Sequence, residues 1–336
     1  MKNHSVTITD IARELGVTPS TVSRALSNSP RVNEKTRQRI QEAARKMGYQ
    51  PNVLASLLRK GTSGTIGMIV PRINRHFFSN VISGVERIVN PAGFNLLIYQ
   101  SDELHEKEVL GLQTFLKNRV AGIIISLASD TSDFKHLEQL NVLEVPLVQF
   151  DRVNDNLLGA KIVNDNFNGA YLGVKHLIKS GYKKIAHLAG PLHINVYKER
   201  LNGYIEALKE AGIEVNDQLV VSGVLTRDAG ANAVKKIIDT KADAIFCAGD
   251  YSALGAMLDL KLRGFNVPQD IGIMGFANEP FSEIISPALT SVEQNAFEIG
   301  NRAAQAIIKM IEKKNSSINT QEIVPVRLIV RESSVK

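Results

Sequence analysis

The sequence predicts a small all-helical headpiece followed by a larger α/β body that contains two doubly wound parallel sheets. The headpiece is indicated by short amphipathic helices around a tight turn within the first sixty residues. The body is indicated by apolar strands that alternate with amphipathic helices, because several strands are apolar on both faces, as buried parallel strands are. Charge separates the two parts: residues 1–60 hold 11 Lys or Arg against 4 Asp or Glu, whereas the remainder holds 29 against 30.

Size and composition favour a protein of two or three compact units with a substantial core. The chain has 336 residues, of which 44% are hydrophobic. It contains no apolar run of membrane-spanning length and no charged-then-apolar leader, so we expect neither a membrane span nor a secretory signal. The one cysteine, Cys247, lies in an apolar strand pattern, and we expect an inert, buried thiol. These features together indicate a cytoplasmic location.

The stretch "ITDIARELGVTPSTVSRALS" predicts two short helices around a turn. Thr9 is the expected N-cap of the first helix, and Gly16 ends that helix by adopting a left-handed conformation. Thr18 is the expected cap of the second helix, and Pro19 suits its first turn, where no amide donor is needed. This arrangement is a helix-turn-helix, in which the second helix enters the major groove of DNA.

The second helix has little apolar surface because we expect only Val22 and Leu26 to face inward. Pro19, Ser20, Ser23 and Arg24 are then left on the outer side. Serine binds base edges or phosphates, and an arginine binds guanine with two hydrogen bonds. A helical hairpin with a merely solvated face is the alternative, but the concentrated positive charge favours binding to nucleic acid.

A third helix is predicted over residues 34–47, with Asn33 as its cap and Gly48 at its end. Its outer side carries possible phosphate contacts, namely Arg37, Arg39, Arg45 and Lys46. A short helix over residues 53–58 follows, and "GTSG" then makes a joint. So short a helix is marginal alone, and we expect it to fold against DNA or a partner.

The body shows no catalytic motif. It lacks a dinucleotide-binding glycine pattern, a phosphate-binding loop and a nucleophile elbow, and its histidines have no metal-ligand spacing. His187 is expected to be a core or cleft residue. We therefore expect a protein that is not an enzyme and that has no cofactor and no metal site.

Polar residues at strand ends are more informative, because ligands of doubly wound sheets bind at the carboxyl ends of the strands. Asp151 and Arg152 end one predicted strand, Asp250 ends another, and "GFANEP" follows a third. Arg200 begins a predicted helix. Two such sheets that face each other enclose a cleft.

The segments "VTITDIARELGVTPSTVSRAL", "VNEKTRQRIQEAARKMGYQPN" and "PNVLASLL" resemble the DNA-binding headpiece and hinge of the lactose-repressor/galactose-repressor (LacI/GalR) family of bacterial transcription regulators. The resemblance implies base reading by Pro19, Ser20 and Arg24, and it implies backbone contacts by Thr18, Thr21 and Ser23. It also places Leu58 as a wedge in the minor groove and Ala55 where two hinge helices meet. The full set of expected DNA-binding residues is Thr9, Thr18, Pro19, Ser20, Thr21, Ser23, Arg24, Asn28, Asn52, Ala55 and Leu58.

The body resembles the effector-binding core of the same family, which has the shape of a periplasmic sugar-binding protein. By position, Arg200 matches the arginine that holds ligand hydroxyls or a carboxylate. The resemblance implies a cleft for a sugar-type effector lined by Phe77, Phe78, Asp151, Arg200, Leu225, Asp250, Asn278 and Gln294. It implies a headpiece over 1–50, a hinge over 51–63, a first lobe over 64–161 plus 295–320, and a second lobe over 162–292 plus 322–336.

The resemblance also implies a mechanism. A homodimer reads a pseudo-palindromic operator in double-stranded DNA, and ligand closure of the cleft changes how well the hinges engage it. No leucine heptads follow the last strand, so we expect a dimer and not a coiled-coil tetramer.

One departure concerns the ligand. Family members often carry "GFDD" where this chain has "GFANEP", so Ala277 and Asn278 replace an acidic pair. The expectation is a cleft without that carboxylate, which would suit a sugar acid. Two alternatives stay open: a cytoplasmic sugar-binding protein or sugar enzyme with an incidental basic N-terminus, and a nonspecific nucleoid-binding protein.

Overall fold

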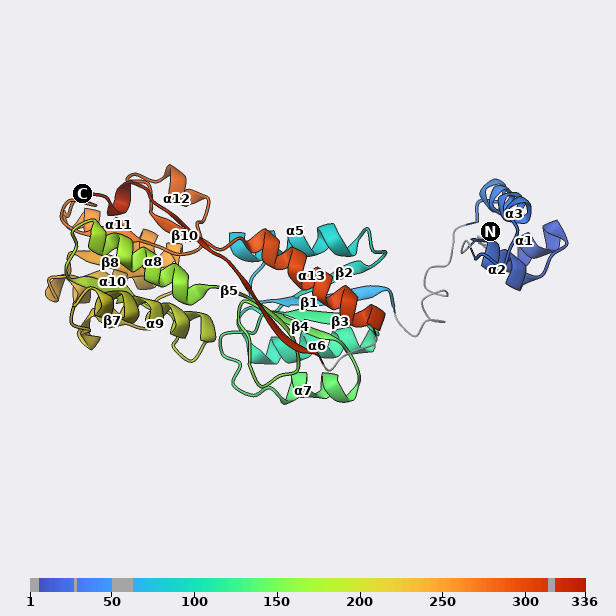
Figure 1. The fold of residues 1–336 in the computed structure, drawn as a ribbon, viewed down its shortest axis with the longest axis horizontal. Coiled ribbons are helices and arrows are strands. Elements are labelled where there is room, and N and C mark those ends of the chain that lie inside the picture. Colours follow the sequence, from blue (N-terminus) through green and yellow to red (C-terminus); the bar gives the residue numbers. More distant parts are fainter. Residues whose placement is uncertain (1–5, 27–28, 50–62, 314–317) are drawn as a thin grey trace. The chain divides into compact units, whose positions relative to one another are not determined.

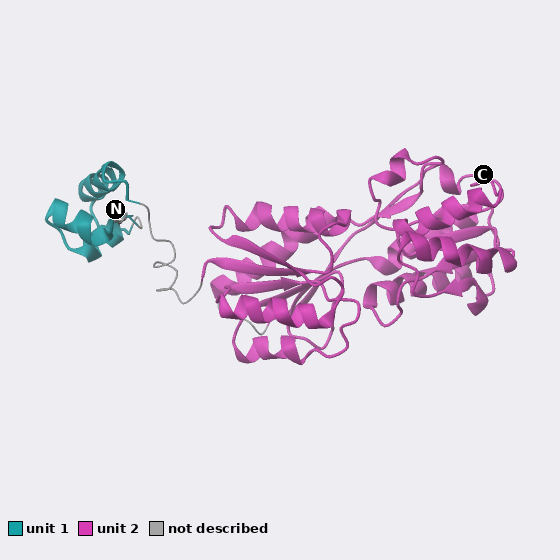
Figure 2. Cartoon of the chain, turned by 180° about the vertical axis from the view of Figure 1, so that it is seen from behind, with its two compact units in different colours: residues 1–61 teal, residues 62–336 magenta. Residues whose placement is uncertain are grey.

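The computed structural model describes residues 6–26, 29–49, 63–313 and 318–336. The chain forms two compact units, residues 1–61 and residues 62–336, which Figure 2 shows in different colours. Within the described ranges, no helix has both the length and the apolar character needed to cross a membrane.

The described residues of the first unit form the helices α1 (Ile8–Leu15), α2 (Pro19–Leu26) and α3 (Glu34–Lys46). Their buried apolar residues form one small core, which consists of Ile11, Ala12, Val22, Ala25, Val32, Ile40 and Ala44. The predicted left-handed turn is confirmed, since Gly16 has φ 64°. The cap of α3 is also confirmed, because the side chain of Asn33 accepts the N–H of Thr36 at 2.8 Å.

Two details of the headpiece differ from the sequence prediction. The N-cap of α1 is Thr7 and not Thr9, because Thr7 and Asp10 form a reciprocal capping box that starts the helix two residues earlier. The inner face of α2 also includes Ala25, which like Val22 has no exposed surface, whereas the predicted Leu26 packs against this core but is only partly buried. The i, i+3 spacing of Val22 and Ala25 fits the narrow contact that α2 makes.

The first lobe of the larger unit is built on a parallel sheet with strand order β11-β5-β4-β3-β1-β2. The strands are β1 (Thr65–Val70), β2 (Asn95–Gln100), β3 (Gly122–Ile125), β4 (Leu147–Phe150), β5 (Gly159–Asn164) and β11 (Asn319–Val324). The helices α5 (His76–Val89) and α13 (Ala296–Lys313) share one core with this sheet. The helices α6 (His105–Lys117) and α7 (Lys135–Val142) share another, so the sheet is covered on both faces (Figure 1).

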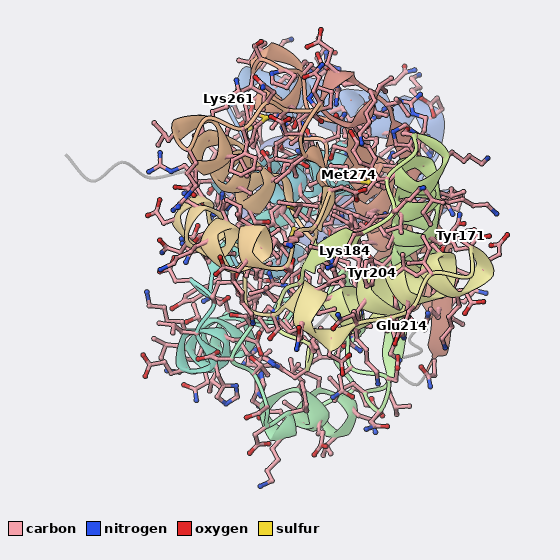
Figure 3. The ribbon with its side chains drawn as sticks, turned by 90° about the vertical axis from the view of Figure 1, so that its left-hand side faces the viewer. Tyr171, Lys184, Tyr204, Glu214, Lys261 and Met274 are labelled. Atoms are coloured by element: carbon pink, nitrogen blue, oxygen red, sulfur yellow. The ribbon has the colours of Figure 1, made fainter. Side chains whose placement is uncertain are left out.

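The second lobe repeats this arrangement around a parallel sheet with strand order β7-β6-β8-β9. Its strands are β6 (Ile185–Leu188), β7 (Val220–Val221), β8 (Ala244–Cys247) and β9 (Gly272–Met274). One face carries α8 (Asn166–Lys179) and α9 (Asn195–Glu210), whose core includes Tyr204 and Met274, both labelled in Figure 3. The other face carries α10 (Arg227–Asp239) and α11 (Asp250–Leu262).

The remaining elements complete the second lobe. An antiparallel pair joins β10 (Ser291–Glu293) to β12 (Arg327–Ile329). Three short helical segments, residues 217–219, α12 (Phe281–Ile284) and residues 332–334, lie in its loops.

The chain passes between the lobes after β5, after β10 and after β11. The three crossings are tied together, because Gln294 Nε2 donates to Asn164 Oδ1 at 3.1 Å and Asn295 Nδ2 donates to the carbonyl of Pro325 at 2.6 Å. Adjacent crossing segments are the usual site of hinge motion between two lobes, and here side-chain amides hold them together.

The crossing points differ from the expected lobe boundaries of 64–161 plus 295–320 and 162–292 plus 322–336. β5 continues to Asn164, three residues beyond the expected boundary. β11 pairs with β5 over its whole length, with Val324 opposite Asn164, so residues 322–324 belong to the first lobe. Pro325 interrupts the apolar run "EIVPVRLIV" between β11 and β12, and the chain changes lobe there.

Candidate DNA-reading helix and inter-lobe cleft

The outer side of α2 is polar and open to solvent. Thr18, Pro19, Ser20 and Arg24 are exposed, whereas Thr21 and Ser23 are half-buried. Thr18 Oγ1 lies 2.9 Å from both Ser20 Oγ and Thr21 Oγ1, and it accepts the N–H of Thr21 at 3.3 Å. The start of α2 therefore presents hydroxyl groups beside the positive end of the helix dipole, which suits contact with phosphate.

The outer side of α3 contributes fewer free cations than its sequence suggested. Arg37 is half-buried, and its Nη2 donates to the carbonyls of Ser29 and Val32 at 3.2 and 3.0 Å while Nη1 pairs with Glu34 at 2.7 Å. This arginine holds the loop between α2 and α3 and is not available for phosphate. Arg39, Arg45 and Lys46 are exposed, as expected.

Four of the expected DNA-binding residues, Asn28, Asn52, Ala55 and Leu58, lie outside the described residues, as does the helix expected over 53–58. Thr9 is described and is exposed in the first turn of α1.

A cavity of about 350 Å³ lies between the lobes of the larger unit. Seven of the eight expected effector residues line it, namely Phe77, Phe78, Asp151, Arg200, Leu225, Asp250 and Gln294. Asp151 directly follows β4, and the segment that ends at Asp250 directly follows β8. The carboxyl ends of both parallel sheets therefore face the same space, as expected for doubly wound folds.

The guanidinium of Arg200, on α9, is held by hydrogen bonds from two of its three nitrogen atoms. Arg200 is 5% exposed, its Nε donates to Asn166 Oδ1 at 3.0 Å, and its Nη1 donates to the carbonyl of Ala248 at 2.6 Å. Its guanidinium carbon lies 3.6 Å from the centre of the Phe276 ring, a cation–π contact. Among the described residues Nη2 has no hydrogen-bond partner, and Arg200 lines the cavity, so Nη2 is left to donate to a ligand. Burial lowers the pKa of Arg200.

Asp151 supplies acceptors from the opposite lobe. Its carboxylate accepts no hydrogen bond from the described residues, and burial raises its pKa. The neighbouring Arg152 is committed elsewhere, since its guanidinium binds both carboxylate oxygens of Glu103 at 2.5 and 3.2 Å. Free acceptors on one lobe and a free donor on the other match the hydroxyl groups of a small polar ligand.

Asp250 lines the cavity but its carboxylate is already occupied. It accepts hydrogen bonds from Ser291 Oγ at 2.6 Å, Ser282 Oγ at 3.1 Å and the N–H of Glu279 at 2.7 Å. Although burial raises its pKa, these three donors favour its charged form. This residue fixes the loop that follows β9.

Asn278 does not line the cavity. Its amide oxygen accepts from Arg331 Nη2 at 2.8 Å, and its Nδ2 donates to Glu293 at 2.9 Å. Positive φ angles of 120° at Ala277 and 50° at Asn278 reverse the backbone, and Ala277 and Glu279 line the cavity instead.

The acidic pair is absent at Ala277 and Asn278, as the sequence showed, but this loop still brings a carboxyl group to the cavity, that of Glu279. Glu279 is 6% exposed, and burial, reinforced by the nearby Asp250, raises its pKa to about 7. The N–H of His76 and the charge of Arg75, both in the first lobe, act in the opposite direction. Comparing "GFANEP" with the family pattern position by position missed Glu279, because this acid follows the two compared positions in the sequence. The positive φ angles of Ala277 and Asn278 accompany its entry into the cavity.

The rim of the cavity joins the lobes by several contacts that the sequence did not reveal. The Arg75 guanidinium lies 3.9 Å from the centre of the Tyr251 ring, and His193 Nε2 lies 2.8 Å from the carbonyl of Ser129. Asn195 Nδ2 also donates to the carbonyl of Asp151 at 3.1 Å. Each pair joins residues that are distant in sequence, so no local pattern could have identified it.

His187 and Cys247 are core residues, as predicted. The His187 ring has no exposed surface and stacks on Phe246 with 4.7 Å between centroids, and burial lowers its pKa to about 4. Cys247 is buried in the second lobe, and burial raises the pKa of its thiol.

The chain matches two family models. One, described as "Bacterial regulatory proteins, lacI family", covers residues 7–52, and the other, described as "Periplasmic binding protein-like domain", covers residues 174–334.

Several known proteins are similar to this chain over nearly the whole length of both proteins. Catabolite control protein A of Priestia megaterium is 34% identical over 333 residues, which cover 98% of this chain and 99% of that protein. The ribose operon repressor of Halalkalibacterium halodurans is 33% identical, with 98% and 97% covered. A solved structure of the transcriptional regulator CelR in complex with cellobiose has a TM-score of 0.74 and 27% identity, with 98% and 99% covered.

Three observations indicate the same family: the helix-turn-helix headpiece, the two-lobed body with its cleft, and the similarity to known regulators over nearly the full length. The chain belongs to the lacI family of bacterial regulatory proteins and is a DNA-binding transcriptional regulator.

Proposed function

We propose that this protein is a cytoplasmic homodimeric repressor whose affinity for a pseudo-palindromic operator is set by a small sugar or sugar derivative bound between the lobes. The observation that carries the proposal is the cleft itself, in which Arg200 Nη2 and the Asp151 carboxylate offer a free donor and free acceptors from opposite lobes. The ribose operon repressor and the CelR–cellobiose complex are similar proteins whose names point to sugars.

The DNA contacts that we propose come from the exposed polar side of α2. Arg24 reads a base, Pro19 and Ser20 contact base edges, and Thr18, Thr21 and Ser23 contact the phosphate backbone. Thr9, Asn28, Asn52, Ala55 and Leu58 complete the proposed set. The excess positive charge of residues 1–60 supplies the sequence-independent part of the affinity.

The cleft walls suit a sugar because they combine apolar and polar groups. Phe77, Phe78 and Phe276 offer apolar surface, and Asp151, Arg200 and Glu279 offer polar atoms. A ligand that binds both lobes favours the closed form of the hinge, and coupling of about 1–3 kcal/mol to operator binding is enough for a switch.

The test begins with the selection of bound DNA from a random pool by the full-length protein at two salt concentrations. We expect a palindromic consensus whose affinity falls as salt rises. Equal affinity for all sequences would instead support a nonspecific nucleoid-binding protein.

The ligand is then sought by calorimetry with ribose, cellobiose and sugar acids. We expect a saturable heat for one class, which Arg200→Ala abolishes and which the exposed-site control Arg263→Ala retains. Binding that is unchanged in Arg200→Ala would refute the proposed site, and release of a chemically altered sugar would support a sugar enzyme.

A further inference from the structure

A second cluster of ionisable side chains lies in the first lobe and is separate from the cleft. His105 and Glu108 are one turn apart at the start of α6, and His136 comes from the first turn of α7. One potential ligand atom from each of the three residues lies within 4.8 Å of the other two. None of the three residues lines the cavity between the lobes.

The cluster is buried around Glu108, which has no exposed surface. The Glu108 carboxylate accepts the N–H of Ala128 at 2.6 Å and the hydroxyl of Thr131 at 3.1 Å, and it lies 2.8 Å from His136 Nε2. The His105 and His136 rings are 4.8 Å apart and nearly perpendicular. A carboxylate in such a place needs a positive partner, because an isolated buried charge is strongly unfavourable.

Both imidazole rings have an unused nitrogen. The Nδ1 atoms of His105 and His136 are buried and have no hydrogen-bond partner among the described residues. The His136 side chain is only 7% exposed. Glu108 Oε1 and His136 Nε2, which lie 2.8 Å apart, are close enough to bind one ion in place of their hydrogen bond. Buried polar atoms without partners are rare and commonly mark a bound ion or water.

We propose that His105, Glu108 and His136 bind a divalent transition-metal ion of the zinc class. Two imidazoles and one carboxylate form a donor set that such ions prefer, whereas magnesium and calcium prefer oxygen atoms alone. Three protein ligands leave a position for water or another small ligand.

The present spacing requires only a modest adjustment. Donor atoms about 2.1 Å from a tetrahedral zinc ion are about 3.4 Å apart. A pair at the widest separation of 4.8 Å must therefore approach by about 1.4 Å. Rotation about the side-chain bonds of a histidine covers such a distance.

The sequence did not indicate this site. His105 and Glu108 have an i, i+3 spacing, but His136 follows 28 residues after Glu108, beyond β3. The packing of α6 and α7 on the same face of the sheet brings them together. The inference does not rest on the proposed function, because zinc binding is measured without DNA or sugar.

The test is to dialyse the full-length protein against a chelator and then to titrate it with zinc in a calorimeter. We expect one saturable site per chain that His136→Gln weakens at least tenfold. The matched control His176→Gln, which removes a partly buried histidine of the second lobe, should leave the affinity unchanged. Absence of saturable binding, or equal affinity in His136→Gln and the unaltered chain, would overturn the proposal.

A second measurement keeps the proposal testable if His136→Gln fails to fold. Cobalt(II) added to the unaltered, metal-free protein should give the visible absorption of a site with nitrogen and oxygen ligands, and one equivalent of zinc should remove that absorption. A cobalt spectrum no different from that of the ion in buffer would overturn the proposal equally.

Discussion

The clearest energetic prediction concerns Glu279, the buried carboxyl at the cleft. Burial raises its pKa from the ordinary 4.5 to about 7, and the neighbouring Asp250 adds to this effect. The unfolded chain exposes Glu279 to water, where the ordinary value returns. Folding therefore makes ionisation of this side chain less favourable, and the stability of the lobe depends on pH.

The sign follows from which state holds the proton. Below pH 4.5 both states are protonated and the contribution of Glu279 to stability is fully present. As pH rises towards 7 the unfolded chain releases its proton first, so the free energy of unfolding falls. Above the folded-state pKa the loss is complete, and a change in pKa from 4.5 to about 7 corresponds to about 3 kcal/mol.

The substitution Glu279→Gln removes the titration and keeps the size of the side chain. We expect the variant to be more stable than the unaltered protein by about 3 kcal/mol at pH 8 but by only about 1 kcal/mol at pH 5. Urea unfolding at both pH values, followed by circular dichroism, measures the two differences. Any contribution of the substitution that does not depend on pH cancels between them.

The matched control is Glu214→Gln, at an exposed glutamate of the second lobe that Figure 3 labels. It should change stability by less than about 0.5 kcal/mol at either pH. A stability difference for Glu279→Gln that is equal at pH 5 and pH 8 would refute the reasoning, because it would show that Glu279 ionises alike in both states.

Three further predictions concern the headpiece and the packing of the first lobe. Arg24→Ala should relax base preference at one operator position by about 1–3 kcal/mol, measured with single-base variants of the selected site; a uniform loss across sequences would contradict base reading. Thr7→Ala should cost about 1 kcal/mol of headpiece stability in thermal unfolding, whereas Thr9→Ala should cost much less; the reverse order would contradict the observed cap. Gly84→Ala should destabilise the first lobe by about 1–3 kcal/mol in urea unfolding, because the added methyl would lie 2.2 Å from the carbonyl oxygen of Phe297; unchanged stability would show that α5 and α13 separate freely.

Local patterns predicted the headpiece well because its structure is local. Gly16 ends α1 and Asn33 begins α3 through contacts within a few residues, and apolar spacing identified most of the small core. The error at the start of α1 was also local, because the N-cap is Thr7 and not the predicted Thr9, only two residues away. Arg37 was different, because its partners in the loop between helices are visible only after folding.

The cleft was predicted in outline because strand ends are visible in sequence and parallel sheets place them on one edge. Asp151 and Asp250 line the cavity for that reason, but only the structure shows that the Asp250 carboxylate is already occupied by its three hydrogen bonds. Glu279 lines the cavity in place of the predicted Asn278 because Ala277 and Asn278 both have positive φ angles, which no spacing rule anticipates.

The sequence by itself determined the order of helices and strands, the division into a basic headpiece and a two-lobed body, and the side chains at the ends of the strands. These depend on apolar periodicity, capping and charge, which act over a few residues at a time. Tertiary structure alone decided that β11 joins the first lobe, that Glu279 enters the cleft and that His136 meets Glu108. Those contacts join residues far apart in the chain, and the packing of whole elements against a shared sheet decides which of them meet.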